Sequence, residues 1–204
     1  MILLKQMLIA LIWILLNKQI NNKLGDFMSS LYIAVEFNDE DKAKLAEKQL
    51  YLKQNSKKGD FEDPTKFHIT VKFLSNNDID NELAIKALQL FKERYKVNKF
   101  NITAKDFYQF DHNVSWIGVN NSLPLYEIKY QLDDCLKEVG FPLKKDKFKQ
   151  YTPHITMGYN VIHNDDFNSK FDGINICIDN ISLWNGFKAN DKYIHNFIYR
   201  VDFE

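Results

Sequence analysis

The chain has 204 residues, 45% of them hydrophobic, and its 27 basic and 27 acidic side chains give zero formal net charge. This length allows one sizeable core or two small lobes, and the charge balance argues against a protein that coats long nucleic acid by bulk electrostatics, although a local basic pocket fits. Two cysteines are too few for a disulfide framework, and no C-x-x-C, P-loop or zincin pattern occurs. The sequence therefore predicts neither a metal site nor a cofactor.

The N-terminal segment is apolar, with residues 7–16 reading MLIALIWILL. This run is shorter than the about 20 residues that a membrane-spanning helix needs. Three interpretations stay open: a signal-peptide core, a short membrane anchor, or an extension that precedes a domain starting at Met28. We treat residues 1–27 as an apolar N-terminal extension and residues 28–204 as the folded domain, and we expect a cytoplasmic protein that residues 1–27 could tether to a membrane.

The remaining chain alternates between strand-like and helix-like patterns. Aromatic and β-branched content predicts strands at residues 31–37, 66–74, 100–110 and 114–119, within 148–159, and in a closing hairpin of 174–184 and 193–203. Helical spacing of apolar residues predicts helices at residues 39–55, 78–95 and 123–139. Residues 56–64, SKKGDFEDP, are expected to form a polar loop.

The order of these elements predicts an α+β fold. The second half of the chain repeats the sequence of strands and helices found in the first half, so two strand–helix–strand lobes of similar size are expected to follow one another. No low-complexity linker separates the two halves. A single bilobed domain is therefore a better interpretation than two independent domains.

One short motif occurs in both halves. Residues 67–71 read FHITV and residues 153–157 read PHITM, so the tripeptide His-Ile-Thr appears twice, each time inside an apolar strand. Side chains at positions i and i+2 of a strand point to the same face. Each motif should therefore present an imidazole and a hydroxyl on one surface, while the isoleucine between them points into the layer beneath.

These side chains suit phosphodiester chemistry. One histidine can hold a proton near neutral pH while the other accepts one. The hydroxyl groups can donate hydrogen bonds to phosphate oxygens as negative charge builds on them. A single such motif would indicate a structural histidine, but two identical copies in matching positions indicate a shared site.

The paired motifs resemble those of the 2H phosphoesterase superfamily. FHITVKFL is similar to the first motif of the LigT-type enzymes, YTPHITMGY is similar to the second, and the opening strand LYIAVEF also fits. The resemblance covers about residues 30–203. It implies two antiparallel-sheet lobes with flanking helices around a central cleft, with His68 and His154 as general acid and base and Thr70 and Thr156 as phosphate-binding hydroxyls.

The resemblance also implies an activity. We expect a phosphodiesterase that needs no metal and hydrolyses 2′,3′-cyclic phosphates on RNA ends or nucleotides, with His154 as the base and His68 as the acid. The alternative within the family is cleavage of 2′,5′-oligoadenylates or cyclic dinucleotides in nucleotide-signalled defence. A nucleotide-binding module without turnover is the non-enzymatic alternative. A monomer is expected.

Other residues near the motifs are weaker candidates. Lys72 has the same strand parity as His68 and Thr70, so it is a candidate for binding substrate phosphate, although a solvent-facing lysine has the same pattern. Lys149 belongs to a lysine cluster before the second motif, and Tyr151 could stack on a base or pack in the core.

The remaining aromatic and histidine candidates are weaker still. Trp116 and Tyr32 could also stack on a base, but core packing is the favoured interpretation. The other histidines, His112, His163 and His195, show no clustered spacing and are expected to have no catalytic role.

Overall fold

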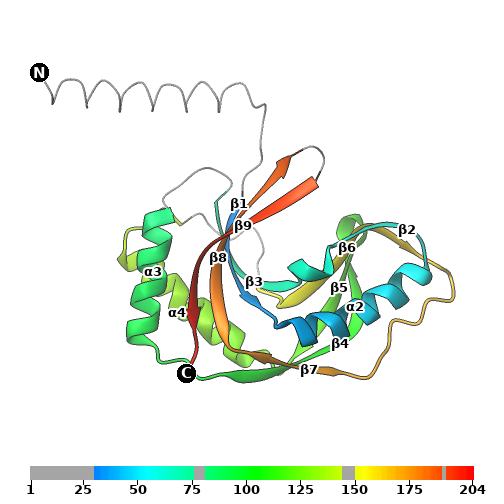
Figure 1. Cartoon of the computed structure of the whole chain (residues 1–204), viewed down its shortest axis with the longest axis horizontal. Coiled ribbons are helices and arrows are strands. Elements are labelled where there is room, and N and C mark those ends of the chain that lie inside the picture. The colour runs from blue at the N-terminus through cyan, green and yellow to red at the C-terminus, as the bar shows by residue number, and fades with distance from the viewer. Residues whose placement is uncertain (1–29, 76–80, 144–149, 190–191) are drawn as a thin grey trace, which may run out of the picture.

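The computed structural model describes residues 30–75, 81–143, 150–189 and 192–204 (Figure 1). The predicted extension at residues 1–27 and the candidate Lys149 lie outside these residues. The described chain contains three α-helices, namely α2 (Asp39–Gln54), α3 (Asn81–Arg94) and α4 (Leu123–Glu138). Its nine strands are β1 (Ser30–Glu36), β2 (Ser56–Phe61), β3 (His68–Ser75), β4 (Phe100–Phe110), β5 (Val114–Asn120), β6 (His154–His163), β7 (Ile174–Ile178), β8 (Asn180–Ala189) and β9 (Lys192–Asp202). Two short 3-10 helices, η1 (Pro64–Lys66) and η2 (Asp111–Asn113), precede β3 and β5.

The strands form two antiparallel sheets. The first sheet has the order β3-β1-β8-β9, and the second has the order β2-β6-β5-β4-β7. Together with the three helices they make a bilobed α+β fold, as the sequence predicts. The lobes, however, are not successive halves of the chain, because β2 joins the second sheet while β8 and β9 complete the first.

The helices cover the sheets on their apolar faces. Helices α3 and α4 pack against each other beside the first sheet, and α2 lies along the second sheet (Figure 1). The core between them includes the fully buried residues Ile33, Leu45, Leu88, Ile117 and Leu132. Burying each such side chain contributes about 1.5–3 kcal/mol relative to leaving it in water. Among the helices of the described residues, none combines the length and apolarity of a membrane span.

Helix α2 begins after a residue whose side chain caps its first turn. Asn38 is the N-cap, and its side-chain oxygen accepts a hydrogen bond from the backbone N–H of Asp41 at 2.8 Å. This bond satisfies one of the unpaired amides at the helix start. Acidic side chains then fill the first turn, where they interact favourably with the helix dipole. Helix α2 therefore begins at Asp39, where the predicted helix begins.

The prediction of a polar loop at residues 56–64 is wrong for its first part. Ser56–Phe61 forms β2, which pairs with β6 from Ser56 opposite His163 to Phe61 opposite Gly158. β2 is an edge strand, and four of its six residues are polar or charged with substantial exposure. Edge strands of this kind lack the apolar alternation on which a sequence prediction depends.

The predicted strand at residues 174–184 divides into two strands in different sheets. Up to Ile178 the chain is β7, paired with β4, and from Asn180 it is β8, paired with β1. The buried Asn180 side chain fixes this crossing, since it accepts from the Glu36 amide at 3.3 Å and donates to the Glu36 carbonyl at 3.2 Å. The hairpin between β8 and β9 forms as predicted.

A β-bulge in β3 changes which residues share a face. Ala34 of β1 pairs with Thr70, but its neighbour Ile33 pairs with Lys72, so Val71 is the extra residue. Adjacent residues of β1 point to opposite faces, and their partners must do the same. The prediction that Lys72 lies on the face of Thr70 is therefore wrong.

Lys72 instead forms an internal ion pair with α4. It is 6% exposed, and its Nζ lies 2.9 Å from Oδ1 of Asp133. The other oxygen of Asp133 lies 3.0 Å from Nζ of Lys129, one turn earlier on the helix. One carboxylate thus forms ion pairs with two ammonium groups between β3 and α4.

Replacing this carboxylate should destabilise the fold. We expect Asp133→Ala to lower the free energy of unfolding by about 3 kcal/mol, because two poorly hydrated ammonium groups lose the carboxylate that they contact. Urea denaturation measures the change. The matched control is Asp134→Ala, which removes an exposed ion pair with Lys137 and should cost less than about 1 kcal/mol. Equal losses in the two variants would contradict this account.

Candidate active site

The first motif is held by the turn that precedes it. The side chain of Asp63 accepts a hydrogen bond from the Thr65 amide at 3.0 Å and so caps η1. The Lys66 carbonyl at the end of this turn accepts a hydrogen bond from Nδ1 of His68, at 2.8 Å. In the neutral imidazole this bond keeps the proton on Nδ1, so Nε2 can accept one. The Thr70 hydroxyl lies 3.2 Å from Nε2 and can donate to it.

The second motif repeats this arrangement. Nδ1 of His154 donates to the Thr152 carbonyl at 2.7 Å, which again leaves Nε2 as the available nitrogen. Thr156 shares the half-buried side of β6 with His154. Ile69 and Ile155, between the histidine and the threonine of each motif, are fully buried. The predicted division of each motif into an outward and an inward face is confirmed.

Several contacts connect the two motifs. Strands β3 and β6 lie against each other although they belong to different sheets (Figure 1). The phenol of Tyr151, just before β6, donates to the Thr70 carbonyl at 3.2 Å. Tyr126 of α4 in turn donates to the Tyr151 carbonyl at 2.9 Å. The segment that carries His154 is therefore attached directly to the strand that carries His68.

Both imidazoles favour their neutral forms. Burial lowers the pKa of His68 below its ordinary value, against the effect of its bond to the Lys66 carbonyl, and the charges of His154 and of Lys42 on α2 lower it further. Burial likewise lowers the pKa of His154, against the effect of its bond to Thr152. Since the two imidazoles influence each other electrostatically, protonation of one disfavours protonation of the other. The pair is suited to holding a single proton.

Aromatic rings surround His154. Its ring lies 5.0 Å from that of Phe110 and 5.6 Å from that of Trp116, both nearly edge to face. The Trp116 ring is stacked between Tyr108 at 4.7 Å and Phe110 at 4.5 Å. Trp116 is only 9% exposed, which confirms core packing, but Tyr108 and Phe110 are exposed. Neither Tyr108 nor Phe110 is among the predicted site residues, because only the pairing of β4 with β5 and of β5 with β6 brings Phe110 to His154 and Tyr108 to Trp116.

Two further rings contact His68. Tyr32 of β1 is buried, as the core-packing interpretation predicts, and its ring stacks on His68 at 5.4 Å. His195 of β9 lies 6.0 Å from His68 and forms a hydrogen bond with the Tyr32 hydroxyl. His195 therefore lies beside His68 in the fold, and the expectation that it has no catalytic role stays a prediction. No local pattern could have revealed this contact, because β9 reaches the site through long-range strand pairing.

The predicted substrate-binding residues have different outcomes. Lys72 points toward α4 and not to the face of His68 and Thr70, on which its predicted binding of substrate phosphate depended. Tyr151 is half-buried, its ring contacts that of Tyr126, and burial raises the pKa of its hydroxyl. Its stacking on a base stays a prediction. Within the described residues, no group of three or more His, Cys, Asp and Glu side chains could hold a metal ion.

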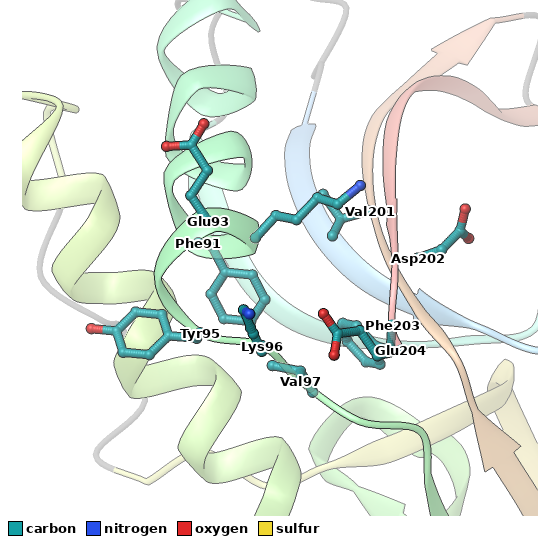
Figure 2. Close-up of a pocket in the computed structure, with 10 residues that line it drawn as sticks. Phe91, Glu93, Tyr95, Lys96, Val97, Val201, Asp202, Phe203 and Glu204 are labelled. Carbon is teal, nitrogen blue, oxygen red and sulfur yellow. The ribbon is translucent and has the colours of Figure 1, made fainter.

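A separate pocket of about 370 Å³ lies at the C-terminal end of α3 (Figure 2). Its lining comes from the last turn of α3, the segment after it, and the end of β9 with the C-terminal residues. Figure 2 shows acidic and basic side chains of both signs around an apolar floor that includes Phe91 and Phe203. No residue of either His-Ile-Thr motif contributes to this pocket.

Solved structures share this fold. Escherichia coli LigT in its apo form superposes with a TM-score of 0.68 at 18% sequence identity, covering 86% of this chain and 97% of LigT. LigT complexed with 3′-AMP gives a TM-score of 0.67 at 17% identity, with coverage of 86% and 97%. A protein from Thermus thermophilus gives 0.65 at 15% identity, with coverage of 85% and 97%.

The family assignment has its own support. The model of the 2′-5′ RNA ligase superfamily matches residues 41–172, which is more than half of the chain. The matched range includes both His-Ile-Thr motifs and the strands that carry them. The chain therefore belongs to the 2′-5′ RNA ligase superfamily of 2H phosphoesterases.

Proposed function

We propose that the protein is a phosphodiesterase that hydrolyses 2′,3′-cyclic phosphates on RNA ends or nucleotides, with His68 and His154 as its acid–base pair. The observation that carries this proposal is the repeated Nδ1 hydrogen bond to the carbonyl two residues earlier. It leaves the Nε2 atom of each imidazole available for proton transfer. Neither imidazole needs a metal ion for this task.

The charges around the pair favour a particular division of roles. Lys42 disfavours protonation of His68, whose Nε2 already lies within hydrogen-bonding distance of the Thr70 hydroxyl. We therefore assign the proton of the free pair to His154, which makes His68 the base and His154 the acid. The sequence-based expectation was the reverse, with His154 as the base and His68 as the acid, because the sequence does not show that Lys42 acts on His68.

The proposed reaction is a single displacement at phosphorus. His68 Nε2 removes a proton from water as the water oxygen bonds to phosphorus, and the bond between phosphorus and one ribose oxygen breaks. His154 Nε2 gives its proton to that leaving oxygen, so the pair ends with the proton on His68. Thr70 and Thr156 donate hydrogen bonds to the non-bridging oxygens, which carry the growing negative charge. Proton exchange with solvent restores the starting state.

Exposed rings beside each motif support a nucleotide substrate. Phe110 lies next to His154, and Tyr108 stacks on Trp116, which also contacts His154. Phe73, which is 61% exposed, contacts Tyr32 next to His68. Aromatic faces bind bases by stacking whatever their identity. LigT has been crystallised with 3′-AMP, which agrees with a nucleotide site in this fold.

The presence of exposed rings on both sides favours a second candidate. A phosphodiester with a base on each side, such as a 2′,5′-linked oligoadenylate or a cyclic dinucleotide, could use both sets of rings. Incubation of each substrate with the protein in EDTA, followed by mass spectrometry, separates the candidates by product. Cleavage of the 2′,5′ linkage without hydrolysis of cyclic phosphates would replace the first candidate by the second.

Removal of either imidazole should abolish most turnover. We expect His68→Asn and His154→Asn each to lower kcat by about 10²–10⁴-fold, the usual contribution of a general acid or base. Nucleotide binding, measured by calorimetry, should survive. The control is His112→Asn, because His112 is exposed in η2 with φ of 61°, a conformation that asparagine tolerates. Unchanged turnover in both site variants would contradict acid–base catalysis by His68 and His154 and would favour the interpretation as a nucleotide-binding module without turnover.

The acid and the base can be told apart by the leaving group. A 4-nitrophenyl phosphodiester releases a stable anion, so it needs little help from a general acid. We expect His154→Asn to lose about tenfold less activity on this substrate than on a cyclic phosphate. His68→Asn should lose similar activity on both substrates. The opposite pattern would exchange the two roles.

The pH dependence of kcat/KM should reflect the lowered pKa values. The base must be neutral, so activity falls when the pH drops through its pKa. Because burial and the neighbouring charges of His154 and Lys42 lower the pKa of His68, the acidic limb should have its midpoint below 6.5, the ordinary histidine value. Initial rates between pH 4 and pH 9 measure the limb. A midpoint above 6.5 would contradict the electrostatic account of His68.

A further inference from the structure

His195 and Tyr32 form a closed group of rings with His68. The Tyr32 ring stacks on His68 at 5.4 Å, and the His195 ring lies edge-on to Tyr32 at 5.9 Å and 6.0 Å from His68. Nδ1 of His195 shares a hydrogen bond with the Tyr32 hydroxyl. Each ring thus contacts the other two, and His68 is held on two sides.

We propose that Tyr32 and His195 are a positioning pair that fixes the imidazole of His68 in its working orientation. This inference rests on the proposed function of His68. Tyr32 suits the task because it lies on the central strand β1 and is only 3% exposed. His195 suits it because β9 reaches this position only through its pairing with β8, where His195 lies opposite Gly186. Glycine there leaves no side chain beside the His195 ring.

Burial, more than the surrounding charges, keeps His195 neutral near pH 7. Burial lowers its pKa to about 4, with contributions from the positive charges of His68 on β3 and Lys66 on η1, against the negative charge of Asp63. Tyr32 on β1 is a further titratable group in contact with it. A neutral imidazole contacts His68 without adding a positive charge.

The hydrogen bond distinguishes positioning from simple filling of space. Leucine at position 195 would fill a similar volume, but it offers no partner to the Tyr32 hydroxyl. Asparagine places a polar atom near the location of the histidine Nδ1. If the pair acts through this bond, asparagine should preserve its function and leucine should not.

The test uses the full-length chain with His195→Leu, His195→Asn and Tyr32→Phe. We expect His195→Leu and Tyr32→Phe to lower kcat by roughly ten- to a hundredfold with little change in KM, because small displacements of an acid–base group have effects of this size. His195→Asn should stay close to the wild type. The matched control is Asn196→Leu, which makes the same kind of change at the next, exposed position of β9. Full activity in His195→Leu and Tyr32→Phe would overturn the inference.

A second readout does not depend on turnover. The ¹⁵N shifts of the His68 ring report which nitrogen carries the proton, and the bond to Lys66 predicts a single Nδ1–H form in the wild type. We expect a mixture of tautomers in His195→Leu and Tyr32→Phe and a single form in His195→Asn. An unchanged single form in all variants would overturn positioning even if the protein proved to be a phosphodiesterase. An inactive wild type with the expected shifts would overturn only the proposed function.

The losses of activity caused by the two substitutions should not be additive. If Tyr32 and His195 act through one hydrogen bond, the double variant Tyr32→Phe with His195→Leu should lose no more activity than the worse single variant. Multiplied losses would show two independent contributions and would overturn the pair. The single oxygen removed in Tyr32→Phe keeps the test informative if His195→Leu folds poorly.

Discussion

The site depends on a hydrogen bond that occurs twice, from a histidine Nδ1 to the carbonyl oxygen two residues earlier. For His68 the acceptor is Lys66 and for His154 it is Thr152. Each acceptor lies two residues before the first residue of a strand, Lys66 at the end of η1 and Thr152 in the segment before β6, and its carbonyl orients the ring. The fold thereby controls which nitrogen of each imidazole is free. The proposed proton transfers, the threonine contacts and the supporting rings all assume this orientation.

The two sheets are tied together more closely than two lobes in series would be. β2 leaves the first half of the chain to pair with β6, and the chain returns from β7 to β8 at Asp179. The phenol of Tyr151 adds a direct bond from the second motif to the strand of the first. These connections restrict relative movement of His68 and His154, which an acid–base pair acting on one phosphorus requires.

The sequence was informative wherever a residue's role is expressed locally. The motifs and the three described helices could be predicted, since sequence identity and helical periodicity are short-range signals. β2 was missed because an exposed edge strand has a polar composition. The face of Lys72 was misjudged because a bulge at Val71 is set by pairing with β1, and His195 was missed because its neighbours come from distant strands. These three features could not be predicted because each depends on the pairing of strands that are distant in the sequence.

The crossing at Asp179 has a consequence for how the protein can be divided. A chain that ended before β8 would retain both His-Ile-Thr motifs, yet β1 would lose the partner on its second edge. The exposed edge would then present unpaired amides and carbonyls together with the apolar residues Ile33 and Val35. The first sheet, which carries His68 on β3, can therefore be completed only after β8 and β9 have been synthesised. Neither half of the chain forms a complete sheet system alone, so fragment exchange must carry β8 and β9 together with β1.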